Sequence, residues 1–313
     1  MTDIVEGYLA LDPALKGGVA ALGNFDGVHR GHAAVLETAR ALAGELGVAT
    51  VAAVFKPHPR RYFRPDTHPF RLMSDGQRIR ALGEAGAVRV HHIPFGPELA
   101  AMSPEAFARD VLKEGLGLDG VVTGADFRFG RDRAGDAQVL RRLGERFGFV
   151  ARTAPEIAEG QEKISSTAIR AALEAGDPQR AADLLGRPWA MEGVVTRGDQ
   201  RGRVLGFPTA NLSLGDYQRP KFGVYAVRAR VPGDGGWRDG VANLGRRPTV
   251  AGTEERLEVH LFDFTGDLYG RTLEVTFERF IRPERKFDGL EALKAQIAAD
   301  AETARALLSR AAP

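Results

Sequence analysis

Hydrophobic and polar residues follow two different periods along the chain, and the change falls near residue 186. Before it, short apolar runs are typical of buried strands: "GVAALGNF", "GVATVAAVF", "AVRVHHIPF", "GVVTGADF" and "FVARTA". Between them lie stretches with helical spacing: "HAAVLETARALAGELG", "DGQRIRALGEAG", "SPEAFARDVLKEGLG" and "DAQVLRRLGERFG". Ser103 followed by Pro104 predicts a helix start, because serine caps a first turn and proline fits its first position. Strands alternating with helices predict an α/β fold, a parallel sheet covered on both faces.

After "LLGRPWAMEGVV" the apolar residues alternate strictly, as in "GVYAVRARV", "LEVHLFDF" and "RTLEVTFERFI". In the last stretch, Leu273, Val275 and Phe277 share one face, and the polar residues between them share the other. Such strands predict an antiparallel sheet that forms a small β-barrel. A closing helix is predicted by the apolar stripe of Leu290, Leu293, Ile297 and Leu308. Asp288 and Glu291 can cap its start.

Length and composition fit this division. A chain of 313 residues favours about two domains, which we place at residues 1–186 and 187–313. The sequence has no cysteine, which excludes disulfides, thiolate metal sites and cysteine nucleophiles, and fits a reducing cytoplasm. It shows no apolar run that could cross a bilayer and no signal-peptide pattern. With a net charge of +2, we expect neither a nucleic-acid nor a membrane partner.

The clearest chemistry lies in "GNFDGVHRGH", residues 23–32, between the first of these apolar strands and the helix after it. Its glycines let the backbone approach a ligand, and the helix start offers unpaired N–H groups and a positive dipole end. His29 and His32 can both reach the space above that end and stabilise a transferring phosphoryl group. The residues alone also allow a tight turn with solvent-facing histidines, or a metal site with Asp26.

Two motifs that lie far apart in the sequence together indicate a specific protein superfamily. "HRGH" is similar to the His-x-Gly-His signature of the nucleotidyltransferase superfamily, and "ISSTAIR", residues 164–170, resembles its second motif. There a hydroxyl side chain caps a helix, and an arginine on the first turn reaches a triphosphate. The resemblance implies a Rossmann-like sheet with His29 and His32 as catalytic residues. It also implies nucleotide or substrate contacts at Gly23, Asn24, Phe25, Asp26, Gly31, Ser165, Ser166, Thr167 and Arg170.

Two further stretches narrow the first domain. "FKPHPRRYF" at residues 55–63 and "GADFRFGRDRAGD" at residues 124–136 resemble the FMN adenylyltransferase module of bacterial FAD synthetases. That family usually has an acidic residue where this chain has Lys56, so no role follows for Lys56. The resemblance implies flavin contacts at Asp126, Phe127 and Phe129. Taken alone, Phe127 and Phe129 also fit ordinary strand core.

In the second domain, "GFPTANL" at residues 206–212 places Thr209 and Asn211 two residues apart, with oxygens facing the same way. Mg²⁺ takes few protein oxygens and keeps waters and phosphates, so the pair suits this ion. A turn in which both residues bond their own backbone is the alternative. The stretch resembles the Pro-Thr-Ala-Asn motif of riboflavin kinase, and stretches up to residue 302 resemble the same family in order and spacing.

This second resemblance implies site residues too. Alternation in "LEVHLFDF" puts Leu257, Val259 and Leu261 on one face and Glu258, His260 and Phe262 on the other, open face. A carboxylate there can accept a proton from a substrate hydroxyl, and the family's matching glutamate is the catalytic base, which implies that role for Glu258. Substrate contacts are implied at Gly206, Phe207, Pro208 and Arg285, and Mg²⁺ ligands at Thr209 and Asn211. Arg246 stands where the family leads us to expect a smaller residue.

The two resemblances together imply a bifunctional riboflavin kinase and FAD synthetase. Riboflavin, FMN and ATP would be its small-molecule partners, Mg²⁺ its metal, and flavoproteins the recipients of the FAD. A nucleotidyltransferase for another phosphorylated acceptor, and a flavin-binding protein without catalysis, remain alternatives. "RGD" at residues 197–199 carries little weight as a motif. The sequence does not indicate an oligomeric state.

Overall fold

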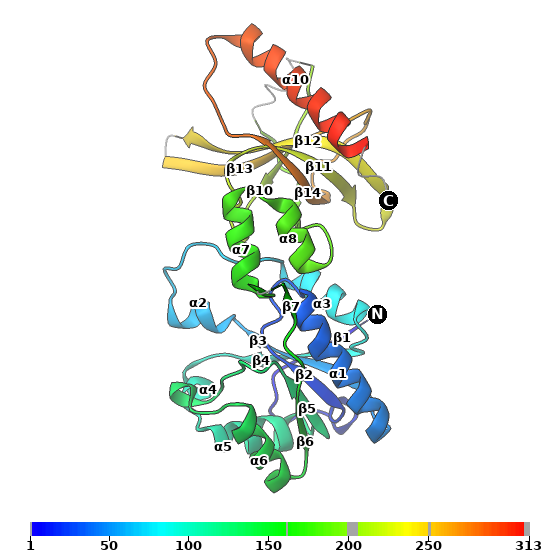
Figure 1. The fold of residues 1–313 in the computed structure, drawn as a ribbon, viewed down its shortest axis with the longest axis vertical. Helices are drawn as coiled ribbons and strands as arrows, with labels where there is room; N and C mark the ends of the chain where they lie inside the picture. Colours follow the sequence, from blue (N-terminus) through cyan, green and yellow to red (C-terminus); the bar gives the residue numbers. More distant parts are fainter. Residues whose placement is uncertain (1, 161, 199–205, 250–251, 310–313) are drawn as a thin grey trace. The chain divides into compact units, whose positions relative to one another are not determined.

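The computed structural model describes residues 2–160, 162–198, 206–249 and 252–309 (Figure 1). The chain forms two compact units. Unit 1 comprises Met1–His68 and Asp75–Ser165, and unit 2 comprises Pro69–Ser74 and Ser166–Pro313. A six-residue segment from the first third of the sequence therefore belongs to unit 2. The predicted domains of residues 1–186 and 187–313 stay a prediction.

Unit 1 is built on a six-stranded sheet in the order β1-β4-β3-β2-β5-β6. Every neighbouring pair is parallel, which confirms the predicted parallel sheet. The strands are β1 (Asp3–Glu6), β2 (Val19–Leu22), β3 (Thr50–Lys56), β4 (Arg89–Pro94), β5 (Gly120–Thr123) and β6 (Val150–Thr153). The edge strand β1 was not predicted, because only Val5 of its four residues is buried and no periodic signal results.

Helices and turns of unit 1 connect these strands. They are η1 (Pro13–Leu15), α1 (Arg30–Leu46), α2 (Pro59–Phe63), α3 (Asp75–Glu84), α4 (Pro97–Ala101), α5 (Pro104–Ala106), η2 (Phe107–Gly115), η3 (Arg131–Arg133) and α6 (Ala137–Phe147). The predicted start at Ser103 is confirmed, since its hydroxyl accepts the Ala106 N–H at 3.1 Å. The predicted single helix continues as a π-helix, η2. A hairpin, β7 (Ala158–Glu159) and β8 (Glu162–Lys163), completes the unit.

The helices cover both faces of the sheet. Side chains of η2 and α6, among them Phe107, Leu112 and Leu140, share one core with Ala20 and Ala53 of the sheet. Helix α1 packs on the opposite face, against β2, β3 and β5. The carboxyl ends of the strands therefore form an edge from which the loops after β2, β3 and β5 project, the place where such sheets bind ligands.

Unit 2 contains a six-stranded antiparallel sheet in the order β10-β13-β12-β11-β14-β9. Its strands are β9 (Ala190–Val194), β10 (Ala210–Ser213), β11 (Gly223–Val231), β12 (Asp234–Thr249), β13 (Gly252–Leu261) and β14 (Thr272–Arg282). Its helices are α7 (Ser166–Ala175), α8 (Pro178–Leu185) and α10 (Leu290–Ser309). A bridge between Thr196 and Asn211 joins the two outer strands, and the Thr196 N–H donates to the Asn211 carbonyl at 2.9 Å. The predicted small barrel is thereby confirmed.

The predicted stripe on the closing helix is partly wrong. Leu308 is buried, but Leu290 is 67% exposed at the helix start. The helix instead packs through Ala301, Ala304 and Leu308 on the outer face of the barrel. The small alanine side chains allow this close approach. Because alanine is only weakly apolar, the predicted stripe did not include these positions.

Segment 69–74 is an integral part of unit 2. Phe70, Leu72 and Met73 are 2%, 1% and 5% exposed. The Trp189 indole N–H donates to the Leu72 carbonyl at 2.8 Å, and the backbone of Arg71 forms a parallel β-bridge with that of Tyr217. The unit therefore closes its core with residues that lie between α2 and α3 in the sequence.

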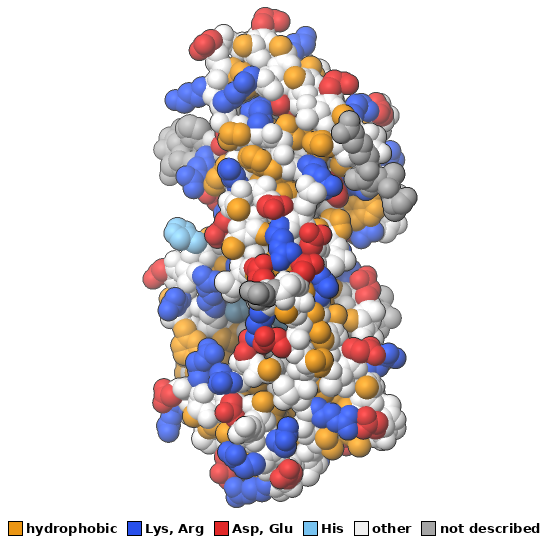
Figure 2. Space-filling view, in the orientation of Figure 1, with side chains coloured by type: hydrophobic (Ala, Val, Ile, Leu, Met, Phe, Trp, Pro, Cys, Tyr) orange, Lys and Arg blue, Asp and Glu red, His pale blue; other side chains and the backbone are white. Residues whose placement is uncertain are grey.

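Two surface properties accompany this fold. Among the described residues, no helix has the length and apolarity needed to span a membrane. On the face shown in Figure 2, basic and acidic side chains are interspersed among neutral ones.

Candidate active sites

The loop after β2 is held in a defined shape before any ligand arrives. The Gly23 N–H donates to the Ala53 carbonyl at 3.1 Å. Phe25 and Val28 adopt φ values of 50° and 40°, and Gly27 one of 96°. Residues other than glycine rarely adopt this left-handed region, so the loop stores strain of the kind found at functional sites. Asp26 is only 2% exposed, which places its carboxyl inside the loop.

His29 and His32 cap α1 reciprocally. The His29 Nδ1 accepts the His32 N–H and the His32 Nδ1 accepts the His29 N–H, each at 3.3 Å. The two rings stack with centroids 3.6 Å apart. Because each Nδ1 accepts, the neutral imidazole carries its proton on Nε2, where it can be donated to a phosphate oxygen.

This tautomer argues against the metal alternative. An Nε2 that carries a proton has no lone pair for a metal ion. Among the described residues, no group of three or more His, Cys, Asp or Glu side chains could hold one. A Cβ on Gly31 would lie 3.1 Å from Cε1 of His29 and 3.4 Å from the Ile164 carbonyl oxygen. The glycine thus lets the first residue of "ISSTAIR" approach the "HRGH" turn.

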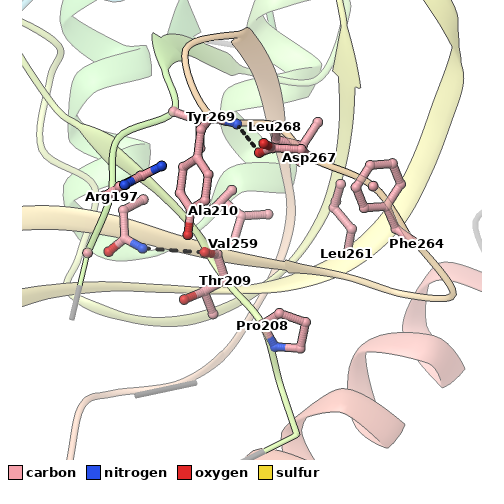
Figure 3. A pocket seen from close by; sticks show the side chains of 14 residues that line it. Arg197, Pro208, Thr209, Ala210, Val259, Leu261, Phe264, Asp267, Leu268 and Tyr269 are labelled. Atoms are coloured by element: carbon pink, nitrogen blue, oxygen red, sulfur yellow. Dashed lines mark hydrogen bonds between the residues drawn. The ribbon is translucent and has the colours of Figure 1, made fainter. Parts of the chain in front are cut away.

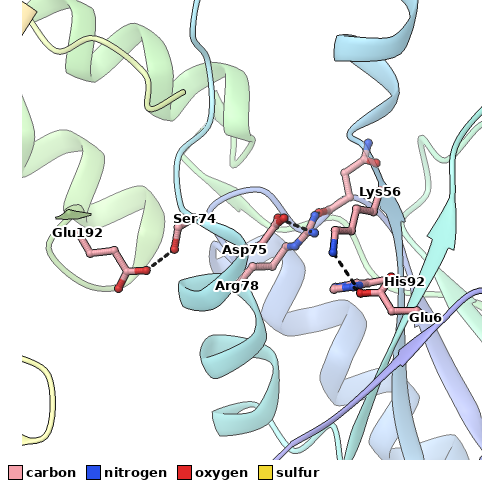
Figure 4. Close-up of polar contacts among 8 residues, drawn as sticks. Glu6, Lys56, Ser74, Asp75, Arg78, His92 and Glu192 are labelled. Carbon is pink, nitrogen blue, oxygen red and sulfur yellow. Dashed lines mark hydrogen bonds and ion pairs between the residues drawn. The ribbon is translucent and has the colours of Figure 1, made fainter. Parts of the chain in front are cut away.

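Asn24 is anchored by a residue that the sequence did not reveal. Arg78 of α3 is 1% exposed, donates to the Asn24 carbonyl at 3.1 Å and pairs with Asp75 at 2.9 Å (Figure 4). The Asn24 Oδ1 is buried without a hydrogen-bond partner in the described structure. An arginine within a helical stretch has no sequence signal for such a role, because its partner lies 54 residues away.

Lys56 forms an ion pair within unit 1, which accounts for a basic residue at this position. Its Nζ lies 3.1 Å from the Glu6 carboxylate, which also lies 2.8 Å from the His92 Nδ1 (Figure 4). The hydrogen bond from His92, followed by that from Lys56, holds the pKa of Glu6 below its usual value. The acidic residue of this cluster thus comes from β1 rather than from position 56.

The predicted flavin contacts differ in exposure. Phe129 is 5% exposed and belongs to the core with Phe107. Phe127 is half-buried and stacks on Phe129, with centroids 5.7 Å apart. Asp126 is exposed and pairs with Lys163 of the β7–β8 hairpin at 3.0 Å. Only Asp126 and Phe127 thus present substantial surface to a ligand.

The second superfamily motif opens a helix, as predicted: α7 begins at Ser166, with Thr167 next. Arg170 lies in unit 2, where its Nε donates to the Phe70 carbonyl at 2.7 Å. Its guanidinium also lies over the Phe70 ring, 5.5 Å from the centroid. Ser165 is the last residue of unit 1.

In unit 2, three polar residues form a row across the sheet. Glu258 of β13 lies directly opposite Asn211 of β10 and opposite Asn243 of β12. Directly opposed residues of antiparallel strands share a face, so the predicted base and the predicted metal ligand are neighbours. Asn243 was missed because only strand register reveals it.

The predicted open face is open only in part. Phe262 is 6% exposed and packs with Ala304 and Leu308 of α10. Glu258 is half-buried, four residues before it. The expectation of a fully open face is therefore wrong at Phe262, because the closing helix lies on it.

The "GFPTANL" stretch leads to a pocket of about 630 Å³ at the barrel mouth (Figure 3). Its lining includes Pro208, Thr209, Ala210 and Asn211, together with Val195, Arg197, Gly198, Val259, Leu261, Phe264, Gly266, Asp267, Leu268 and Tyr269. The volume falls within the range of small-molecule sites, roughly 300–1,000 Å³. One side of this lining carries oxygens and the other is apolar.

Backbone contacts fix the polar side of this pocket. The His260 Nδ1 lies 2.9 Å from the Pro208 carbonyl, and the His260 ring packs on Phe207. Gly206, before them, has a φ of 87°. Asn211 is 6% exposed, and a Cβ on Gly198 would lie 2.6 Å from its Oδ1. The Asn211 Nδ2 also donates to the Thr209 carbonyl at 3.4 Å, so the amide lies between the backbone of Thr209 and that of Gly198.

The last two predicted or questioned positions lie outside this pocket lining. Arg285 contacts Gln296 of α10 and lies over Phe287 at 4.8 Å. Arg246 lies over Phe222 at 4.7 Å and 3.4 Å from the Glu255 carboxylate. Arg246 thus has local partners that account for an arginine there.

The chain thus combines two modules. One is an open parallel sheet with a histidine-capped helix, and the other is a barrel that bears a Glu–Asn row. Both arrangements are typical of proteins that bind nucleotides or other phosphate-bearing substrates. The chain matches the FAD synthetase family over residues 11–168 and the riboflavin kinase family over residues 185–308. It belongs to the bifunctional riboflavin kinase/FMN adenylyltransferase family.

Individual relatives agree. A bifunctional riboflavin kinase/FMN adenylyltransferase from Pseudomonas fluorescens is 45% identical over 305 residues, which is 97% of each chain. One from Escherichia coli (strain K12) is 42% identical over 93% of this chain and 92% of its own. A crystal structure described as a macrolide-efflux protein from Streptococcus pneumoniae is 31% identical, with a TM-score of 0.84 over 96% of this chain and 98% of that one.

Proposed function

We propose that this chain phosphorylates riboflavin with ATP in unit 2 and adenylylates the resulting FMN with a second ATP in unit 1. The observation that carries the proposal is that both motif sets sit on geometry that suits phosphate chemistry. Unit 1 presents two imidazoles at a helix start. Unit 2 sets Glu258 opposite Asn211, which lines the barrel-mouth pocket.

In unit 2, Glu258 accepts the proton of the riboflavin primary hydroxyl as its oxygen attacks the γ-phosphorus of ATP. ADP leaves and FMN forms. Thr209 and Asn211 are the residues that would hold Mg²⁺, since both offer oxygens to the pocket and this ion keeps water and phosphate as its other ligands. When bound, the ion would neutralise phosphate charge. The chain's own part is to orient the hydroxyl and remove its proton.

In unit 1, a phosphate oxygen of FMN attacks the α-phosphorus of ATP, and pyrophosphate leaves as FAD forms. The nucleophile is already an anion, so no base is required. The Nε2–H groups of His29 and His32 donate to the oxygens on which charge develops. The N–H groups at the start of α1 act in the same sense. Asp126, which is exposed, and Phe127, which is half-buried, are the candidates for contact with the flavin ring.

The test is one incubation of the purified chain with riboflavin, ATP and Mg²⁺, followed by chromatographic separation of the flavins. We expect FMN first and FAD after it. FMN without FAD would contradict the assignment of unit 1 and leave that of unit 2 standing. Unchanged riboflavin, in protein shown to be folded, would contradict the kinase assignment, and supplied FMN would then test unit 1 separately.

A further inference from the structure

Arg197 lines the barrel-mouth pocket together with Thr209 and Asn211. The bridge between Thr196 and Asn211 accounts for its place, because Arg197 directly follows Thr196 along the chain. A long cationic side chain thus starts one residue from the backbone partner of Asn211. Phosphates on a Mg²⁺ ion that Thr209 and Asn211 would hold would therefore share a pocket with this side chain.

In the part of the chain that the structure describes, Arg197 has no carboxylate partner. Its guanidinium lies over the Tyr269 ring, 5.4 Å from the centroid (Figure 3). The acidic residue of the pocket, Asp267, instead accepts the Tyr269 N–H at 2.9 Å. Since cation–π contacts at exposed sites are weak and hydrogen bonds to phosphate are charge-assisted, a phosphate can draw the guanidinium away from the ring.

We propose that Arg197 binds the phosphate chain of the nucleoside triphosphate that unit 2 consumes, and that Tyr269 holds it at the pocket when no nucleotide is present. This inference rests on the proposed kinase function. The pocket supports it by its two sides: oxygens at Thr209 and Asn211, and apolar groups that include Val259, Leu261 and Leu268. A guanidinium offers five N–H donors in a planar fork that matches phosphate oxygens.

The experiment measures initial rates of FMN formation against ATP concentration, with riboflavin and Mg²⁺ saturating. The variants are Arg197→Gln and Arg197→Lys. The matched control is Arg238→Gln, because Arg238 is also exposed and lies over an aromatic ring, Phe264, at 5.3 Å, but does not line the pocket. The thermal transition of intrinsic tryptophan fluorescence reports that unit 2 of each variant is folded, because both tryptophans lie in that unit.

We expect Arg197→Gln to raise the KM for ATP about tenfold, the effect of losing one charge-assisted contact. Arg197→Lys keeps the charge and raises it less, and Arg238→Gln leaves it unchanged. A KM for Arg197→Gln equal to the wild-type value overturns the inference, as does an equal rise in the glutamine and lysine variants. If the wild-type chain makes no FMN, the kinase proposal itself fails, which is a distinct result.

Discussion

At the scale of single residues, His29 and His32 have one observed role and one proposed role, which a substitution must separate. Each ring accepts a backbone N–H at 3.3 Å and so stabilises the start of α1. Each is also expected to donate to phosphate from Nε2. Loss of activity after removing a ring would therefore mix a lost donor with a weakened helix cap, whose loss costs about 1 kcal/mol.

His32→Gln resolves this ambiguity, because glutamine at the third helical position is a normal capping-box acceptor. We expect both His32→Gln and His32→Ala to lower kcat for FAD formation by about 10²–10³-fold, the range for one lost oxyanion donor. Only His32→Ala should also lower the melting temperature. Riboflavin phosphorylation by the same proteins should stay within about twofold of wild type, since His32 belongs to unit 1 and the kinase reaction is assigned to unit 2. An equal loss of both activities would argue against two separate sites.

Glu258 allows the converse test in unit 2. We expect Glu258→Gln to lower kcat for FMN formation by about 10²–10⁴-fold, because the amide cannot accept the hydroxyl proton. The KM for ATP should change little, which distinguishes a proton acceptor from a nucleotide contact such as Arg197. FAD formation from supplied FMN is the internal control. A kinase rate close to wild type would remove the base role from Glu258.

At the scale of elements, β4 contains a histidine with no role in the proposed chemistry. His91 is 0% exposed, and neither ring nitrogen has a hydrogen-bond partner in the described structure. Burial, with a smaller contribution from Arg89, lowers the pKa of His91 to about 4. The folded chain thus keeps this imidazole neutral where an unfolded chain, with a pKa near 6.5, takes up a proton.

The consequence is a loss of stability in acid. Well above pH 6.5 the group is neutral in both states and contributes no pH dependence. As pH falls, the unfolded state binds the proton first, so at pH 5 we expect unit 1 to have lost about 2 kcal/mol of unfolding free energy through this group. His91→Phe should remove that slope in urea titrations at pH 7.5 and pH 5, and His68→Phe, at an exposed position, should keep it. A persisting slope in His91→Phe would assign it to other groups.

Elements with a strong periodic signal were predictable from the sequence, and those set by distant contacts were not. The residues of "GVYAVRARV" are those of β11, and Ser103 caps a helix as predicted. β1 escaped because a half-buried edge strand of four residues has no periodicity. At the candidate sites, motifs pointed to His29, Asn211 and Glu258, and their roles stay predictions. They missed the row partner Asn243 and the anchor Arg78, because strand register and a contact over 54 residues create those roles.

At the scale of the whole molecule, the two compact units do not follow the order of the sequence. Segment 69–74 lies between α2 and α3 of unit 1 in the sequence, but it belongs to unit 2, to which it contributes Leu72, 1% exposed. A fragment limited to residues 187–313 would lack this segment, and the Trp189 indole would lose the carbonyl that it bonds at 2.8 Å. Unit 2 is therefore expected to need residues from far outside its own stretch of sequence.

Both tryptophans, Trp189 and Trp237, lie in unit 2, so intrinsic tryptophan fluorescence follows the unfolding of that unit. We expect Leu72→Ala to shift the fluorescence transition to lower temperature, because truncating a buried leucine costs about 2–5 kcal/mol. The matched control is Leu82→Ala in α3, which removes an equally buried leucine, 0% exposed, from unit 1. It should impair FAD formation on heating while the tryptophan transition keeps its midpoint. If Leu72→Ala instead behaved like Leu82→Ala, segment 69–74 would support unit 1 rather than unit 2. If Leu72→Ala shifts the tryptophan transition and Leu82→Ala does not, a stable kinase fragment has to contain segment 69–74 as well as the residues after Ser166.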